Sequence, residues 1–127
     1  MTNELDLDKY TQVEWVSGGR EYPQLDCYGV VNEVRRDLGL PEWPEYAGAE
    51  RNDLDELAAE AKKERQGSEL VDGAVAFCYS GSVVVHVAVL VSVDGRMCAL
   101  ECNPEHNVTV MPASRLERRF VKVEYYS

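Results

Sequence analysis

Two apolar segments joined by an Asp-Gly pair constrain the fold of this chain more than any other feature. Residues 83–93 read VVVHVAVLVSV, residues 96–102 read RMCALEC, and Asp94-Gly95 lies between them. β-branched residues favour strands, and Asp-Gly is among the strongest signals for a two-residue hairpin turn. The sequence therefore predicts a long antiparallel hairpin in which Val93 faces Arg96.

The register of this hairpin decides which side chains share a face of the sheet. Counting outward from the turn, Ala88 faces Glu101 and His86 faces Asn103. Because side chains alternate along a strand, all four lie on one face, with Glu101 diagonal to His86. The opposite face is predicted to carry an apolar set that comprises Val85, Val87, Val91, Cys98 and Cys102. An imidazole and two possible acceptors are thus expected together on one face.

Three further segments have the composition of strands, at residues 73–79, 107–112 and 120–126. Together with the hairpin they predict a sheet of about five strands. The helical patterns of the chain all precede these strands, and such an order is typical of an α+β fold with an antiparallel sheet.

Two helices are expected before the sheet. Apolar residues at helical spacing predict a helix from Cys27 to Leu38, with Asp26 as its N-cap and Gly39 as its end. A second, more polar helix is predicted within residues 52–67, capped by one of its first two residues and ended by the glycine. Its thin apolar stripe favours a partly exposed surface helix.

Length and charge limit the classes of protein that fit. A chain of 127 residues suits one domain, so residues 1–127 are expected to form a single domain whose residues 1–9 are mobile. The formal net charge of -10 argues against nucleic acid as a partner. We find neither a signal-peptide pattern nor an apolar run that could span a membrane, so synthesis in the cytoplasm is the default expectation.

A cysteine and a histidine are the strongest candidates for chemistry. Cys27 is predicted in the first turn of a helix, where free backbone N–H groups and the helix dipole favour a thiolate. His86 could take the thiol proton, and Glu101 or Asn103 could hold the imidazole in the useful tautomer. The alternative is that Cys27 is a small buried apolar residue and His86 is structural. These residues alone leave both interpretations open.

A metal site is a weaker alternative. Cys98, Cys102 and His106 are spaced four and four, which could suggest metal ligands. That spacing is poor for a strand, no CxxC pair exists, and Cys78 has no near partner in the sequence. We therefore expect no metal and reduced thiols rather than a disulfide framework.

Several segments together resemble a known family. They are GGREYPQLDCYGVV, VDGAVAF, HVAVLV, ALEC and VEYY, which cover most of the chain from Trp15 to Tyr126. The chain resembles NlpC-type papain-like cysteine peptidases, above all the short members encoded among the tail genes of phages and prophages. The resemblance implies a reduced papain-like α+β core, in which the nucleophile opens a helix that packs on an antiparallel sheet.

The resemblance also implies roles for individual residues. Cys27 would be the nucleophile, His86 the general base and Glu101 the third catalytic residue, preferred to Asn103 as the alternative. The bond cleaved would be a peptide or amide bond in the stem peptide of bacterial peptidoglycan, with no metal or organic cofactor. The remaining oxyanion donor would be the Cys27 backbone N–H.

This sequence departs from the family pattern at three places. Glu101 stands where histidine is usual, Trp15 stands where a tyrosine is common, and Gly73-Ala74 replaces Gly-Asp. A carboxylate can still accept from an imidazole, whereas an indole has one N–H donor and no acceptor. Trp15 is expected beside the substrate, and the same holds for Asp26 and Tyr28.

Three functions follow as expectations from the resemblance. The first is a cysteine peptidase of the cell wall that is associated with a phage tail and contacts other tail proteins. The second is a tail-assembly or tail-tip structural protein with weak or no catalysis on the same fold. The third is an acyltransferase that uses the same thiol with an amine acceptor in place of water.

Overall fold

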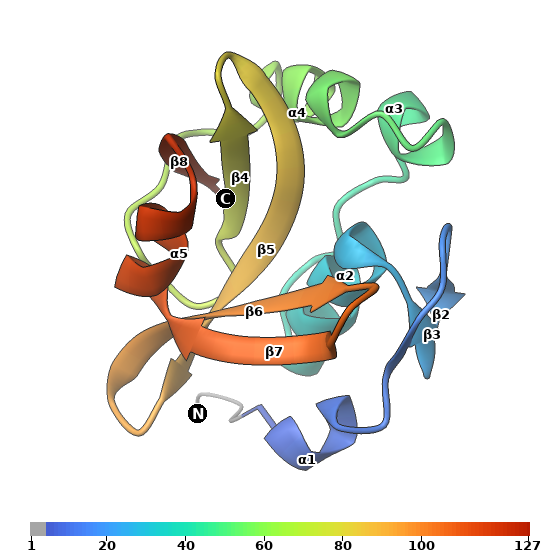
Figure 1. Cartoon of the computed structure of the whole chain (residues 1–127), viewed down its shortest axis with the longest axis vertical. Helices are drawn as coiled ribbons and strands as arrows, with labels where there is room; N and C mark the ends of the chain where they lie inside the picture. The colour runs from blue at the N-terminus through green and yellow to red at the C-terminus, as the bar shows by residue number, and fades with distance from the viewer. Residues whose placement is uncertain (1–4) are drawn as a thin grey trace.

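A five-stranded antiparallel sheet organises the computed structural model, which describes residues 5–127 (Figure 1). The strand order is β7-β6-β5-β4-β8. The strands are β4 (Val75–Ser80), β5 (Val83–Val93), β6 (Arg96–Asn103), β7 (Asn107–Pro112) and β8 (Lys122–Tyr126). This sheet and the helices around it confirm the predicted α+β class and the predicted set of strands.

The hairpin forms as predicted near its turn. Asp94 and Gly95 have φ values of 50° and 78°, and Val93 pairs with Arg96. A type I′ turn needs positive φ at both central positions, which is why an Asp-Gly pair suits it. The predicted register then holds as far as the pair Val89 and Leu100.

Beyond that pair the two strands separate, and the predicted direct partners are wrong. β5 curves away from β6, as Figure 1 shows, and continues against β4, whereas β6 continues against β7. The Cα partner of His86 is Cys78 on β4, and the partner of Glu101 is Thr109 on β7. His86 therefore does not face Asn103 directly, although it stays on the same face as Glu101.

A β-bulge corrects the prediction for Val85. The register of β4 and β5 shifts between Cys78 and Tyr79, so that Tyr79 pairs with Val84 and not with Val85. One extra residue in a strand reverses the faces of the residues beyond it. Val85 is accordingly 46% exposed, and Val84 takes its place in the core.

Two apolar clusters lie on opposite faces of the sheet. The first lies under α2 (Cys27–Asp37) and α4 (Leu54–Lys62) and includes the predicted Val87, Val91, Cys98 and Cys102. The second lies under α5 (Ala113–Arg119) and is formed by small residues of the sheet together with Leu116. The α5 helix was not predicted, because its residues lie between two expected strands and were assigned to no element.

The helix that begins at Cys27 has the predicted ends. The Asp26 side chain caps its first turn, and Gly39 follows its last turn with a φ of 77°. The second predicted helix is present as α4, capped by Asp53, but it ends at Lys62, well before Gly67. A single turn, α3 (Ala47–Glu50), precedes α4 and was not predicted.

The segment expected to be mobile is only partly described. Residues 1–4 lie outside the described residues, whereas Leu7–Tyr10 form the short helix α1. Lys9 Nζ donates to Glu33 Oε2 at 2.5 Å, and the Tyr10 hydroxyl donates to Asp37 Oδ2 at 2.7 Å. These contacts join α1 to α2.

A small sheet surrounds the glycine pair before α2. Its strands are β1 (Glu14–Trp15), β2 (Arg20–Glu21) and β3 (Gln24–Leu25), in the order β1-β3-β2.

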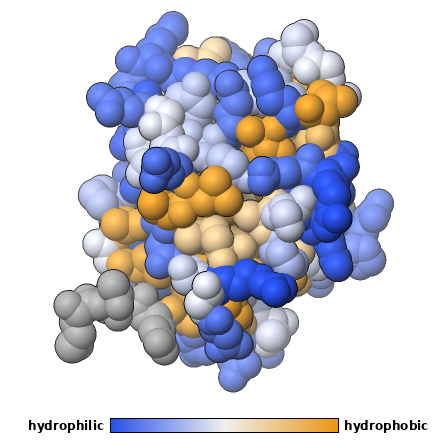
Figure 2. Space-filling view, turned by 90° about the vertical axis from the view of Figure 1, so that its left-hand side faces the viewer, coloured by the Kyte–Doolittle hydropathy of each residue, from blue (hydrophilic) through white to orange (hydrophobic). Residues whose placement is uncertain are grey.

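Figure 2 shows the face of the molecule that lies on the left in Figure 1, where apolar areas are separated by hydrophilic residues. No helix within residues 5–127 is long and apolar enough to cross a membrane.

Candidate functional site

Asp26 fixes the backbone on which the candidate nucleophile sits. Its Oδ1 accepts from the backbone N–H of Gly29 at 2.7 Å and from Arg20 Nη1 at 2.5 Å, and its Oδ2 accepts from Gly18 N at 3.1 Å. The residue is 6% exposed. Its carboxylate is therefore committed to the start of α2 and to the glycine loop, and the residue also lines the pocket at Cys27.

Gly29 is required by the close approach of the glycine loop. A Cβ atom on Gly29 would lie 2.2 Å from the backbone oxygen of Gly19. We expect Gly29→Ala to lower the free energy of unfolding by roughly 2–3 kcal/mol, because the backbone must move to admit the methyl group. Urea unfolding measures this effect. Gly67→Ala is the matched control, since nothing lies within 4 Å of its Cβ position, and equal losses would contradict the account.

Cys27 is the first residue of α2 and is half-buried. It opens on a pocket of about 250 Å³ whose walls also include Trp15, Asn52 and Leu54. No hydrogen bond from the Cys27 N–H is present among residues 5–127, so this donor is available to an oxyanion, as the resemblance implied. Trp15 and Cys27 therefore line the same pocket.

Tyr28 also borders this pocket, but its side chain serves the core. It is 1% exposed, and its hydroxyl donates to the backbone oxygen of Pro44 at 2.7 Å. The phenol is thus committed to the connection that follows α2.

The pKa of the Cys27 thiol is raised, whereas the position at a helix N-terminus had led us to expect a lowered pKa. Burial and the neighbouring Asp26 carboxylate raise the pKa of Cys27 to about 11, and the backbone groups of Val87 and Tyr28 offset this only in part. Burial disfavours a thiolate more strongly than the helix N-terminus favours it. Cys27 is therefore a thiol at neutral pH and needs a base to become a nucleophile.

This pKa predicts how fast Cys27 reacts with an alkylating reagent. The thiolate fraction, and with it the alkylation rate, should rise about tenfold per pH unit from pH 6 to pH 9. Iodoacetamide labelling followed by peptide mass spectrometry measures the rate at Cys27 alone. A plateau below pH 8 would contradict the account, because it would reveal a thiolate already formed at neutral pH.

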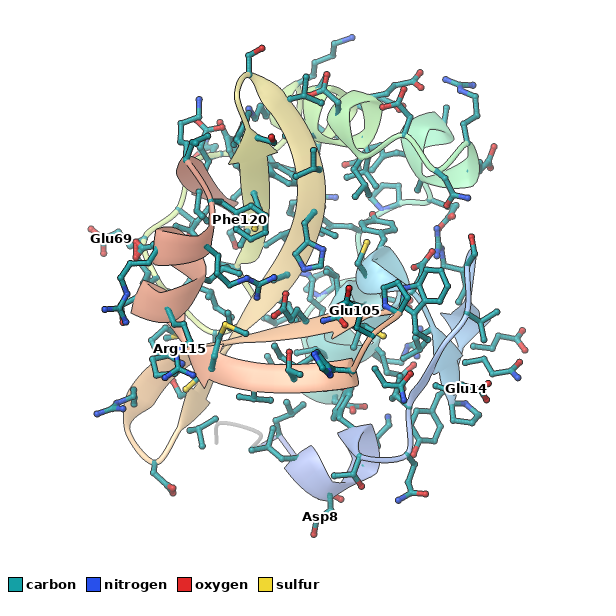
Figure 3. All side chains as sticks on the ribbon, in the orientation of Figure 1. Asp8, Glu14, Glu69, Glu105, Arg115 and Phe120 are labelled. Carbon is teal, nitrogen blue, oxygen red and sulfur yellow. The ribbon has the colours of Figure 1, made fainter. Side chains whose placement is uncertain are left out.

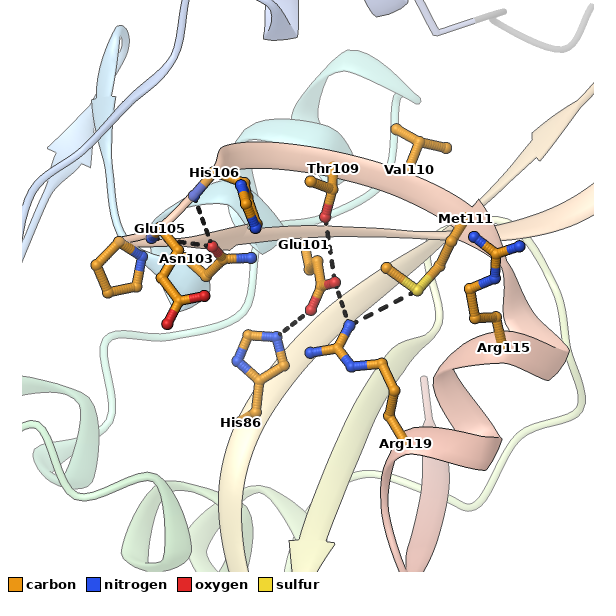
Figure 4. A pocket seen from close by; sticks show the side chains of 11 residues that line it. His86, Glu101, Asn103, Glu105, His106, Thr109, Val110, Met111, Arg115 and Arg119 are labelled. Atoms are coloured by element: carbon orange, nitrogen blue, oxygen red, sulfur yellow. Dashed lines mark hydrogen bonds and ion pairs between the residues drawn. The ribbon is translucent and has the colours of Figure 1, made fainter.

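His86 and Glu101 form a direct pair on the sheet. His86 Nε2 lies 2.7 Å from Glu101 Oε1 (Figure 4). The Phe120 ring stacks on the imidazole with a centroid separation of 6.0 Å. The contact predicted from the hairpin register is thus present, although the strands have diverged. It leaves Nδ1 without a hydrogen-bond partner among residues 5–127.

Glu101 is buried and held by more partners than expected. Its Oε2 accepts from Arg119 Nη1 at 2.5 Å and from Thr109 Oγ1 at 3.1 Å, and the residue is 1% exposed. Burial alone would raise the pKa of Glu101, but the bonds from His86 and Arg119 outweigh it and lower this pKa to about 2. The carboxylate is therefore ionised at neutral pH.

Asn103, the alternative third residue, does not contact His86. Its side-chain oxygen accepts from the backbone N–H groups of Glu105 at 3.1 Å and His106 at 2.9 Å. This arrangement stabilises the turn between β6 and β7, in the way Asn side chains commonly do. The geometry thus favours Glu101 over Asn103 as the partner of the imidazole.

Cys27 and His86 approach each other from different elements. The Cys27 thiol contacts the backbone of Val87, the residue that follows His86 on β5. No hydrogen bond joins Cys27 to His86 among the described residues. Such bonds are often longer or absent without substrate. The structure therefore brings the three predicted residues to one region and joins two of them directly.

His86 lies in a second, larger groove of about 690 Å³. Arg115 on α5 and Glu105 on the turn between β6 and β7 line it with His86 and Glu101 (Figures 3 and 4).

Three residues around the His86–Glu101 pair, Arg119, Thr109 and Phe120, were not identified from the sequence. The signal for Arg119 was the segment 113–119 after Pro112, which is rich in arginine, has helical character and was left without an element between two expected strands.

The proposed metal ligands do not converge. Cys98 and Cys102 lie in the apolar cluster under α2, whereas His106 lines the groove beside His86. No group of three or more His, Cys, Asp or Glu side chains among residues 5–127 is placed to hold a metal ion. All four cysteines are free thiols.

Comparison of the chain with models of protein families and with curated protein sequences gave no match.

Proposed function

We propose that this protein is a cysteine hydrolase with an NlpC-type papain-like core, in which Cys27, His86 and Glu101 act together. The observation that carries the proposal is the buried pair between His86 Nε2 and Glu101 Oε1, at 2.7 Å, beside the helix that begins at Cys27. A buried ionised carboxylate that orients an imidazole near a half-buried thiol is the arrangement that general-base catalysis of thiol attack requires.

The chemistry follows from the protonation states. Because Cys27 is a thiol at neutral pH, His86 takes its proton through Nδ1 while the sulfur attacks the carbonyl carbon. The Cys27 N–H donates to the developing oxyanion, and the ionised Glu101 stabilises the imidazolium. The imidazolium then protonates the leaving amine, and a thioester to Cys27 remains. Water, activated by His86, hydrolyses the thioester and restores the thiol.

The substrate that we propose is the stem peptide of bacterial peptidoglycan, on the strength of the resemblance of the sequence to the NlpC-type family. The pocket beside Trp15 and the groove beside His86 would accept the two sides of the scissile bond. The same resemblance supports association with a phage or prophage tail and contact with other tail proteins.

A second candidate function is a tail-assembly or tail-tip structural protein with weak or no catalysis. Two observations favour it, namely the raised pKa of Cys27 and the lack of a hydrogen bond between Cys27 and His86 among the described residues. A transfer to an amine acceptor in place of water would use the same thiol and the same base.

Digestion of peptidoglycan fragments tests the proposal. Purified protein is incubated with muropeptides of defined stem length, and the products are identified by mass spectrometry. We expect products that carry new amino and carboxyl ends within the stem peptide. Intact muropeptides after long incubation at high enzyme concentration would favour the structural candidate, and amine adducts in place of free carboxylates would favour the acyltransferase.

A further inference from the structure

We propose that Arg119, the last residue of α5, is a positioning residue that acts through Glu101 to keep His86 able to accept a proton. The inference rests on the proposed function, in which His86 takes the proton of Cys27. It goes beyond that function because it assigns a role to a residue other than Cys27, His86 and Glu101.

The first support is that the two carboxylate oxygens of Glu101 bind different partners. Oε1 is bonded to His86, and Oε2 is bonded to Arg119 at 2.5 Å and to Thr109 at 3.1 Å. Glu101 is 1% exposed, whereas the Arg119 side chain is 42% exposed, so solvent screens this ion pair from the Arg119 side only. The carboxylate therefore has one imidazole partner and one guanidinium partner, and its orientation is fixed from both sides.

The second support is that two neighbouring residues at the end of α5 contact the His86–Glu101 pair, one at the carboxylate and one at the imidazole ring. Arg119 ends α5, and Phe120, which follows it, stacks on the His86 ring with an interplanar angle of 18°. Ala113 and Leu116 anchor α5 in the second apolar cluster. Because the helix is fastened to the sheet, the salt bridge and the ring contact are fixed relative to each other.

The third support is electrostatic. The charged and titratable side chains around His86 come from five places: Glu101 on β6, Cys78 on β4, Cys27 on α2, Arg115 and Arg119 on α5, and Glu105 and His106 on the turn between β6 and β7. Among them Glu101 alone is bonded to His86 in the described part of the chain. Without Arg119, the full negative charge of Glu101 would act on the imidazole and favour its protonated form, which cannot accept the Cys27 proton.

A histidine titration by NMR tests this directly and requires no substrate. The His106→Gln background leaves His86 as the only histidine, and its ring signal is followed between pH 4 and pH 9. We expect Arg119→Met to move the titration midpoint upward by about 1 pH unit, because the opposing charge is lost. The midpoint of Arg119→Lys should lie nearer to that of the parent, with at least half of the Arg119→Met shift absent, since lysine keeps the positive charge.

Arg118→Met is the matched control, because Arg118 is an exposed neighbour on the same helix with no hydrogen bond or ion pair among the described residues. It should leave the midpoint within about 0.2 pH units of the parent. A midpoint unchanged in Arg119→Met, or moved equally in Arg118→Met, would overturn the inference. If muropeptides stay intact but the midpoint moves as expected, the proposed function fails and the electrostatic role of Arg119 stands.

Discussion

Cys27→Ala is expected to lower the rate of muropeptide hydrolysis by at least about 1,000-fold. The thiol is the group that attacks the substrate carbonyl in the proposed mechanism, and no other cysteine occupies a comparable place. Cys78, Cys98 and Cys102 are all buried in the apolar clusters of the sheet. The rate is measured by quantifying product muropeptides from the wild type and the variant at equal protein concentration.

Cys98→Ala is the control for this substitution. Cys98 is 6% exposed and lies under α2, away from both pockets. We expect it to cost stability, by about 1 kcal/mol, and to leave the hydrolysis rate within about twofold of the wild type. Residual hydrolysis above about a tenth of the wild-type rate in Cys27→Ala would exclude Cys27 as the nucleophile.

Glu101→Gln is expected to reduce both catalysis and stability. The amide retains the shape of the side chain but loses the charge that His86 and Arg119 share. We expect the hydrolysis rate to fall by about 100- to 10,000-fold, because the imidazolium is no longer stabilised or held in one tautomer. The free energy of unfolding at pH 7 should fall by about 3 kcal/mol, because the buried carboxylate that pairs with Arg119 and accepts from His86 loses its charge.

The stability loss should depend on pH in a defined direction. Since the pKa of Glu101 is lowered in the folded state to about 2, its contribution to stability is fully present above the ordinary pKa of a glutamate. It is lost as the pH falls from about 4.5 to about 2. The difference between wild type and Glu101→Gln in urea unfolding should therefore shrink over this range.

Glu105→Gln is the matched control for the same groove. Glu105 is exposed, and its carboxylate makes no hydrogen bond or ion pair among residues 5–127. Its effect on unfolding should stay within about 0.5 kcal/mol at every pH. A difference for Glu101→Gln that is constant from pH 7 to pH 2.5 would contradict the ion-pair account.

The sequence allowed the start of α2 and the turn of the hairpin to be predicted because both depend on local chemistry. An aspartate before a helical apolar pattern caps a first turn, and Asp26 does so here. Asp94-Gly95 adopts the positive φ values that its turn needs. The hairpin turn allowed His86 and Glu101 to be placed on one face of the sheet, whereas the expectation that Cys27 lies near them came from the family resemblance of the sequence.

The geometry beyond the turn could not be predicted from the pattern of residues. The separation of β5 from β6, and the bulge that exposes Val85, depend on how the whole sheet curves. The nearly continuous apolar run of residues 83–93 is compatible with a strand that stays paired with β6 and with one that bulges and curves away from it. The helix that ends at Arg119 was hidden for a related reason, since residues on both sides of it have the composition of strands.

The protonation state of Cys27 shows a further limit. A helix N-terminus lowers the pKa of a thiol only if burial does not outweigh it, and burial is a property of the folded chain. In this protein burial and Asp26 dominate. The sequence could place the thiol at the start of a helix, but only the structure indicates that Cys27 is protonated at neutral pH, which is why the proposed mechanism requires a base.

The most direct test of the central claim is detection of the acyl-enzyme on Cys27. Wild-type protein is mixed with muropeptide, quenched in acid within the first turnover, and digested for peptide mass spectrometry. We predict that the peptide containing Cys27 gains the mass of the acyl half of the substrate, and that Cys27→Ala shows no such adduct. Product formation with an unmodified Cys27, or with an adduct on another cysteine, would contradict the assignment of Cys27 as the nucleophile.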